Sequence, residues 1–422
     1  MAAFIRYLIL TFIGFANALP IPFTGSTLSV YLTESGYGKE WIGFAALLAI
    51  PFSLKLLWSP LIDHYPAPFC KNKNRKGWML FAIAGMTTSL IAMGSFSPEA
   101  SFTPLALSLF SLSLFTGCLY MTGLHYELES LDRTEYGMGS SFVHGGYRVG
   151  LLAAGALALY LAYLWNWPAM FFIMAAVLAS GGLLVLSSPE PERSAQILAE
   201  KERQWKSYGS TWALVKEEVL LAPCRSFFQR SDWKAILLLI LAFKVGDQLS
   251  KNMEGPFYLS LGFNKADLAL ASKVWGFGAT LTGALIAGLF LKNRRALPAA
   301  ALLGILHAAT ISLNIPLYYA GKSYPLLYLA SALENFTSGL AMSGFIYMLW
   351  RVVDKRYAAT QYALLWSVFS FKGHLVTFLG GQLAATLSWE FFFPLASITG
   401  AFCVAPLFLE LPEKRVADQS TP

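Results

Sequence analysis

The sequence has little charge for its length. Asp, Glu, Lys and Arg make up only 13% of its 422 residues, whereas 56% are hydrophobic and the mean hydropathy is +0.53. A soluble protein of this size needs more charge to cover its surface. The composition therefore excludes an ordinary soluble domain and favours an all-α membrane protein.

The sequence also lacks motifs for catalysis, nucleotide binding and metal binding. The Walker, Gly-x-Gly-x-x-Gly and Gly-x-Ser-x-Gly patterns are missing. The four cysteines have neither the CxxC spacing nor the Cys/His spacing of a metal site, so we expect no disulfide and no metal; they are Cys70, Cys118, Cys224 and Cys403. We expect no enzyme activity and no cofactor.

Long apolar runs dominate the rest. A membrane-spanning helix needs about 20 mostly apolar residues, and the sequence predicts twelve such helices. They cover roughly 4–31, 40–62, 77–97, 104–128, 140–164, 167–187, 234–261, 266–291, 296–319, 324–350, 359–386 and 389–411.

The basic residues outside these spans are asymmetric, and they predict the orientation. Lys and Arg concentrate on the cytoplasmic side of membrane proteins. Clusters at 71–76 and 292–295 fall inside if both termini are cytoplasmic, and only Lys39, Lys265 and Lys322 then fall outside. The net charge of +7 thus reflects topology, and we expect no nucleic-acid partner.

Similar short motifs recur in the two halves of the chain. Gly36–Lys39 and Gly262–Lys265 each follow a first span, and Lys73–Lys76 and Lys292–Arg295 each follow a second. The repetition predicts two pseudo-symmetric six-helix halves, as in the major facilitator fold. The predicted units are 1–187, a cytoplasmic linker at 188–233 with a possible helix at the membrane surface, 234–411, and a cytoplasmic tail at 412–422.

Ionisable residues lie inside the apolar runs. Each costs roughly 3 kcal/mol or more there, so it usually faces a partner or a water-filled path. Their number indicates a protein that moves something polar across the membrane; the alternative is that they only pair with one another. They are Lys55, Arg148, Lys244, Asp247, Lys251, Glu254, Lys273, Glu334 and Lys372.

The C-terminal half holds most of these charges. Lys244, Asp247, Lys251 and Glu254 are three or four positions apart, so they form a stripe of alternating sign on one helix. Glu334 lies about 15 Å along its own predicted helix, at a similar depth. Carboxylates on an aqueous path suit proton coupling, and Asp247, Glu334 and Glu254 are the candidates.

The N-terminal half is sparser. Arg148 is expected to pair with Glu127. Glu129 lies at the end of the same predicted helix as Glu127, at a similar depth. Together with Asp63 these residues form either a cytoplasmic gate or a plain structural salt bridge.

Several motifs resemble AmpG-type muropeptide permeases. The second half has Lys244-Val245-Gly246-Asp247, similar to a K-L-G-D motif of that family. The segment 125–130 differs from the Asp-rich stretch of the family and leaves the substrate open. The other matching segments are 14–20, 25–28, 32–36, 42–43, 55–63, 146–150, 273–283, 334–339 and 357–365.

The resemblance implies proton-driven import of anhydro-muramyl peptides through the bacterial inner membrane. Such ligands need cations for carboxylates, aromatic faces for sugars and amides for hydroxyls. A siderophore or another large polar anion fits as well, and a non-transporting receptor or scaffold is the alternative from another class. We expect a monomer with no cofactor beyond the proton gradient. The candidate substrate-binding residues are Lys55, Trp58, Arg148, Lys244, Lys251, Lys273, Trp275, Asn335, Lys372 and Gln382.

Overall fold

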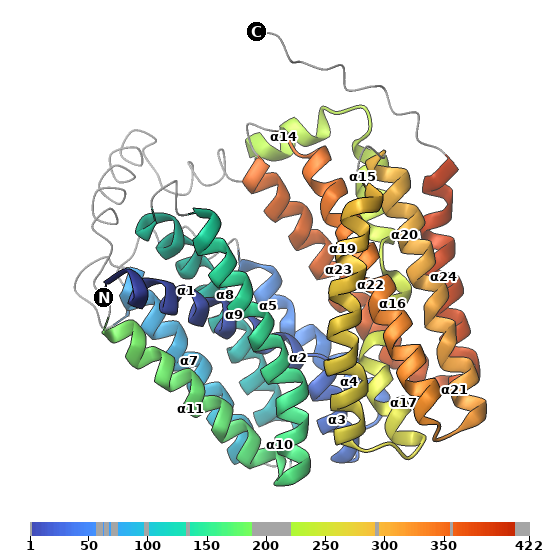
Figure 1. The fold of residues 1–422 in the computed structure, drawn as a ribbon, viewed down its shortest axis with the longest axis horizontal. Helices are drawn as coiled ribbons and strands as arrows, with labels where there is room; N and C mark the ends of the chain where they lie inside the picture. Colours follow the sequence, from blue (N-terminus) through green and yellow to red (C-terminus); the bar gives the residue numbers. More distant parts are fainter. Residues whose placement is uncertain are drawn as a thin grey trace.

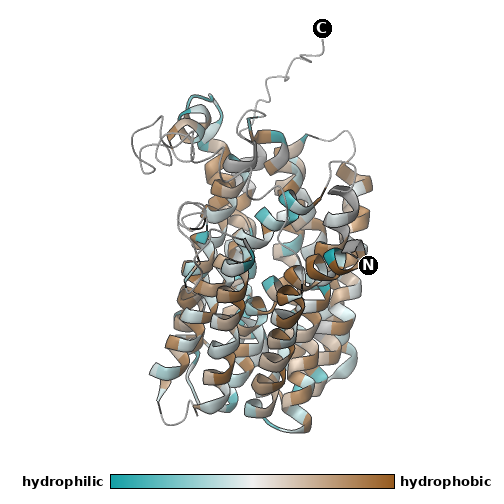
Figure 2. Ribbon diagram, turned by 90° about the vertical axis from the view of Figure 1, so that its left-hand side faces the viewer, coloured by the Kyte–Doolittle hydropathy of each residue, from teal (hydrophilic) through white to brown (hydrophobic). Residues whose placement is uncertain are grey.

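All the elements in the described part of the chain are helical. The structure is a computed structural model, and it describes residues 2–55, 62, 67–68, 75–96, 101–131, 136–187, 221–291, 295–354 and 358–409. Apolar residues run along most of the length of the long helices (Figure 2).

The helices of the first half of the chain lie together on the left of Figure 1. Several are interrupted: α1 ends at Ala18, just before the Pro20 that begins α2. This set consists of α1 (Ala2–Ala18), α2 (Pro20–Phe23), α3 (Ser26–Glu34), α4 (Lys39–Ala45), η1 (Ala46–Ala49), α5 (Ile50–Ser53), α7 (Arg75–Ser95), α8 (Phe102–Ser130), α9 (Tyr136–Leu152), η3 (Ala153–Leu157), α10 (Ala158–Leu164) and α11 (Trp167–Leu186).

The helices of the second half lie together on the right. The short helix α14 (Ala222–Phe228) precedes them and lies at the top of Figure 1. This set consists of α15 (Trp233–Ala242), α16 (Val245–Ser250), η5 (Lys251–Met253), α17 (Glu254–Ser260), α18 (Lys265–Leu268), η6 (Ala269–Trp275), α19 (Gly276–Leu291), α20 (Ala296–Thr310), η7 (Ile311–Leu313), α21 (Asn314–Ala320), α22 (Tyr324–Val352), α23 (Ala358–Thr386) and α24 (Trp389–Leu409).

Within the described residues, eight helices are long and apolar enough to cross a membrane. The predicted span 234–261 is not among them because it is broken into α15, α16, η5 and α17. The 29-residue α22 is also not among them, and Trp389–Val404 is apolar but shorter. The eight are Phe4–Phe23, Lys76–Ser95, Phe102–Glu127, Phe142–Leu164, Trp167–Leu186, Lys265–Leu291, Ala296–Ala320 and Gln361–Thr386.

The two sets of helices meet at one end of the molecule. There α3 contacts α17, α4 contacts α23, and α10 contacts α18. Figure 1 shows the sets side by side at this end and further apart at the end where α14 lies. We call the first the contact end.

Small residues allow the close approach at the contact end. A Cβ on Gly43 of α4 would lie only 2.8 Å from the Cα of Gly381 on α23, closer than real Cβ contacts. Apolar packing also continues across the two sets here, because Val30 of α3 shares a buried cluster with Phe257 of α17 and Phe393 of α24. The contact end is therefore a packed interface.

Candidate functional site

The helix that carries the charge stripe is broken in its middle. Lys244 has φ 57°, the only positive φ at a non-glycine position in the described residues. This left-handed conformation costs roughly 1–2 kcal/mol and separates α15 from α16. Such strain persists only where the surroundings enforce it.

Helix α23 forms hydrogen bonds on both sides of the break. Lys372 of α23 donates from Nζ to the backbone oxygen of Phe243 over 2.7 Å and to Oε1 of Gln248 over 2.6 Å. Thr377 of the same helix donates to the backbone oxygen of Gln248. The break therefore has dedicated hydrogen-bond partners on α23.

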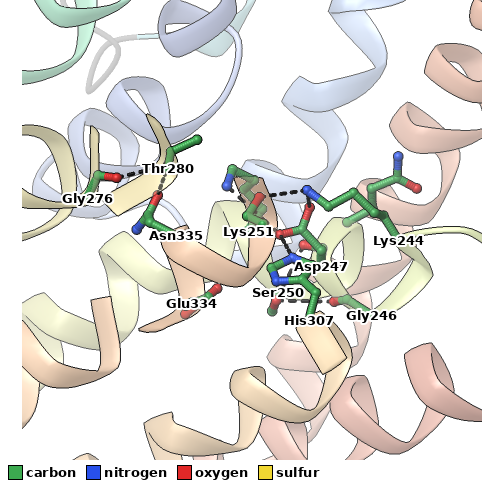
Figure 3. A network of polar contacts seen from close by, with 12 residues as sticks. Lys244, Gly246, Asp247, Ser250, Lys251, Gly276, Thr280, His307, Glu334 and Asn335 are labelled. Atoms are coloured by element: carbon green, nitrogen blue, oxygen red, sulfur yellow. Dashed lines mark hydrogen bonds and ion pairs between the residues drawn. The ribbon is translucent and has the colours of Figure 1, made fainter. Parts of the chain in front are cut away.

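Asp247 lies just beyond the break and has three cationic or ionisable partners (Figure 3). Its carboxylate is 3.0 Å from Nζ of Lys244, 2.9 Å from Nε2 of His307 and 3.9 Å from Nζ of Lys251. The side chains of Asp247, Lys244 and His307 are 5%, 6% and 2% exposed. A buried carboxylate of this kind needs such partners to offset the loss of water.

The contacts continue onto α22. Nζ of Lys244 donates to Oγ of Ser338, and Nδ1 of His307 is 3.1 Å from Oγ1 of Thr337. If His307 is neutral and donates from Nε2 to Asp247, Nδ1 is free to accept from the Thr337 hydroxyl. Asp247 is thus joined to α20 and α22 through hydrogen bonds.

Two further carboxyl groups lie on the other side of Lys251. Glu254 begins α17, and Glu334 is a buried residue of α22. Their carboxyl groups lie within hydrogen-bonding reach of each other. Oε1 of Glu254 is buried and accepts no hydrogen bond from a described donor. A carboxyl pair of this kind forms a hydrogen bond only when one member carries a proton.

The N-terminal set presents two cations over aromatic rings. Nζ of Lys55 lies 3.5 Å from the ring centroid of Tyr120, and the Arg148 guanidinium lies 5.9 Å from that of Phe277. Arg148 and Glu127 are both described, and no ion pair joins them; Glu127 instead lies near His144. The predicted Arg148–Glu127 pair is therefore not formed in this structure. Glu129 is buried in the same region.

Several other predicted residues lie elsewhere. Asn335 bonds to the backbone oxygen of Ser331 and approaches Thr280, within the packing of α22 against α19. Trp275 is 61% exposed. Trp58, Asp63 and the side chain of Lys273 lie outside the described residues.

Gln382 lies at the contact end and donates to the backbone oxygen of Glu40 over 3.2 Å, from one set of helices to the other. Nearby, Lys39 donates to the backbone oxygen of Ala384 over 2.8 Å and lies 3.7 Å from the ring centroid of Trp389. Burial lowers the pKa of Lys39, and the charge of Glu40 opposes that shift.

An ion pair also closes the same end. Lys265 is 2.8 Å from Oε2 of Glu34, which also accepts from Nε1 of Trp167. Because Glu34 belongs to α3 and Lys265 to α18, this pair also joins the two sets. The sequence places Lys39 and Lys265 outside the membrane but does not reveal their partners.

His307, Thr337 and Gln248 are partners of the charge cluster that were not predicted from the sequence. His307 could have been found, since it lies about as far along its helix as Asp247 does along its own. Among the described residues, no group of three or more His, Cys, Asp or Glu side chains is placed to hold a metal ion.

Comparison with known proteins identifies the family. Residues 2–373 match the sequence profile of the Major Facilitator Superfamily. A Rickettsia felis protein that carries the transporter name AmpG 4 is 30% identical over 384 residues, which is 90% of each chain. The chain belongs to the Major Facilitator Superfamily, among its AmpG-type permeases. The prediction of a multi-pass membrane transporter rather than an enzyme is confirmed.

Other relatives agree with this family. The anhydromuropeptide permease of Escherichia coli is 29% identical over 398 residues, covering 94% of this chain and 77% of that one. Solved structures show the same fold at low identity. A D-xylose–proton symporter matches with a TM-score of 0.73, 13% identity and coverage of 98% and 99%. A POT family transporter in complex with 5-aminolevulinic acid matches with a TM-score of 0.70, 11% identity and 95% coverage of each chain.

Proposed function

We propose that this permease imports anhydro-muramyl peptides, or closely similar sugar–peptide anions, in symport with protons. The observation that carries the proposal is the cluster around Lys251, where cations and carboxyl groups lie together at the junction of the two helix sets. The AmpG-type relatives support the ligand class, since one of them is named an anhydromuropeptide permease.

The architecture that we propose has twelve spans in two halves. Residues 1–187 and 234–411 form six spans each, 188–233 links them, and 412–422 is a tail. The distribution of Lys and Arg supports cytoplasmic termini in the inner membrane of a bacterium. With that orientation the contact end is periplasmic, so this structure represents a state closed to the outside. We propose that the transporter works as a monomer.

The ligand contacts follow from chemistry. Lys55, Arg148, Lys251 and Lys273 supply cations for ligand carboxylates, and Trp58 and Trp275 supply flat faces for sugar rings. Lys244 and Lys372 belong to the same candidate set, although their ammonium groups already have partners within the protein. Asn335 and Gln382 are the candidate partners for hydroxyl groups.

Uptake into proteoliposomes tests this proposal. Purified protein should accumulate a labelled anhydro-muramyl peptide against its gradient when the outside is acidic, and a protonophore should abolish that accumulation. Accumulation that persists without a proton gradient would overturn the coupling. Transport of an iron chelate without transport of the muramyl peptide would favour a siderophore permease instead.

Deletion of residues within 188–233 tests the receptor or scaffold alternative. A transporter whose halves still assemble should retain substantial uptake after the linker is shortened. A cellular role that disappears while uptake into proteoliposomes is unchanged would favour the scaffold.

A further inference from the structure

Lys251 differs from the other charges of the buried cluster. Its side chain is 49% exposed, whereas those of Lys244 and Asp247 are 6% and 5% exposed. Its Nζ lies 3.9 Å from Asp247, compared with 3.0 Å for Lys244. Lys251 is therefore loosely paired and open to a ligand.

The position of Lys251 is also distinctive. It begins η5, which contacts α3 and α4 of the N-terminal set as well as α23. Oδ1 of Asn252, the next residue, would be 3.4 Å from a Cβ on Gly25 of the N-terminal set. The segment η5, which carries the exposed side chain of Lys251, thus lies at the junction of the two sets.

Three carboxyl groups act electrostatically on Lys251: those of Asp247, Glu254 and Glu334. Asp247 is already held by Lys244 and His307. The carboxyl groups of Glu254 and Glu334 lie within hydrogen-bonding reach of each other. Lys251 is thus a cation that acts on both members of this pair.

The other ionisable groups on the elements packed against η5 have their own contacts. Glu34 of α3 pairs with Lys265. On α4, Lys39 donates to Ala384, and Glu40 lies next to it.

On α23, Lys372 donates to Phe243 and Gln248, and His374 bonds to Ser53. The hydroxyl of Tyr258, on α17, donates to Asn314. Lys251, by contrast, is half exposed and acts on the carboxyl pair.

Building on the proposed function, we propose that Lys251 couples ligand binding to proton uptake by exchanging partners. A ligand carboxylate binds the ammonium group of Lys251 and takes the place of the Glu254–Glu334 pair as its electrostatic partner. The pair then takes one proton from the side to which the site is open and holds it in a carboxyl–carboxylate hydrogen bond. One ligand negative charge and one proton enter together, so the charge of the site does not change; release reverses both steps.

Binding at two pH values tests the exchange. Wild-type protein in nanodiscs should bind an anhydro-muramyl peptide about tenfold more tightly at pH 5.5 than at pH 8, the ratio that corresponds to a shift of about one pKa unit in the carboxyl pair on binding. Lys251→Gln should bind weakly at both values, Lys251→Arg should restore the dependence, and Glu334→Gln should bind tightly at both. A methyl-esterified probe should show no pH dependence.

Lys322→Gln is the matched control, because this lysine lies over the rings of Phe263 and Tyr324 at the contact end. It should behave as wild type. Lys251→Gln that keeps the full tenfold dependence would overturn the inference.

A second measurement does not depend on the ligand. As the pH of ligand-free wild type is lowered, infrared spectra should show a protonated-carboxyl band appear, and this band should be missing in both Glu254→Gln and Glu334→Gln. In Lys251→Gln the band should persist to higher pH. A wild-type band that survives both glutamine variants contradicts the inference. Failure of wild type to bind or transport the muramyl peptide overturns the proposed function instead.

Discussion

The ammonium group of Lys372 donates a 2.7 Å hydrogen bond to the backbone oxygen of Phe243, where the preceding helix stops. The same ammonium reaches Gln248 beyond the break, so one side chain holds both ends. This geometry supports a positioning role for Lys372 in addition to the ligand contact predicted from the sequence.

Lys372→Met should therefore destabilise the protein. It leaves a buried carbonyl without its charged donor, at a cost of about 1–3 kcal/mol. Thermal unfolding in detergent should show the loss, and Lys322→Met should not. A variant that unfolds like wild type but binds the anionic ligand more weakly would assign Lys372 to the ligand.

Asp247→Asn alone should destabilise the protein more than Asp247→Asn combined with Lys244→Met. The single substitution leaves Lys244 buried without a counter-charge, which costs about 3–5 kcal/mol. Adding Lys244→Met should recover part of that stability, as measured by a double-mutant cycle of thermal unfolding. Strictly additive effects would contradict a direct Lys244–Asp247 interaction.

The Glu34–Lys265 pair should stabilise the closed contact end. The two side chains are 32% and 15% exposed, so the pair is worth about 0.5–1 kcal/mol. Lys265→Met should shift the open population about two- to fivefold, as measured by the distance between spin labels at Ser35 and Ser260. Exchanging the charges, with Glu34→Lys and Lys265→Glu, should restore the wild-type distribution; no restoration would assign the effect to loss of packing.

The contact end should also respond to alkaline pH through Lys39. Burial lowers its pKa in the closed state, so its charged form opposes closure. As pH rises from the lowered pKa towards the ordinary value near 10.5, this penalty is lost and closure should become more favourable. The same spin labels should report it, and Lys39→Met should remove the dependence. A closed fraction that falls with rising pH in wild type but not in Lys39→Met would show instead that the charged form of Lys39 favours closure.

Much of the fold and part of the candidate site could be predicted from the sequence. The family followed from motifs such as Lys244–Asp247, and the pairing of these two residues followed from their spacing. That prediction assumed a continuous helix. The backbone of Lys244 is instead in the left-handed conformation, which no local pattern predicts at a lysine. The approach of Glu254 to Glu334 depends on how two distant helices are rotated, which periodicity alone does not determine.

The gate residues illustrate the same limit. Arg148 and Glu127 are predicted at similar depths, but depth does not place two side chains on facing surfaces. Here Arg148 lies over Phe277 of the other set instead. Their pairing in another conformational state stays a prediction.

The segments η3 and η6 are π-helical and contact each other across the two sets. The packing there therefore depends on the exact number of residues in each segment. A π segment contains one residue more than the α-helical path would, and one residue corresponds to a rotation of about 100°. The face that α10 turns towards α18 is thus determined by an inserted residue within Ala153–Leu157. Deleting a single alanine there would rotate α10 away from its partner, although each remaining side chain would be chemically unchanged.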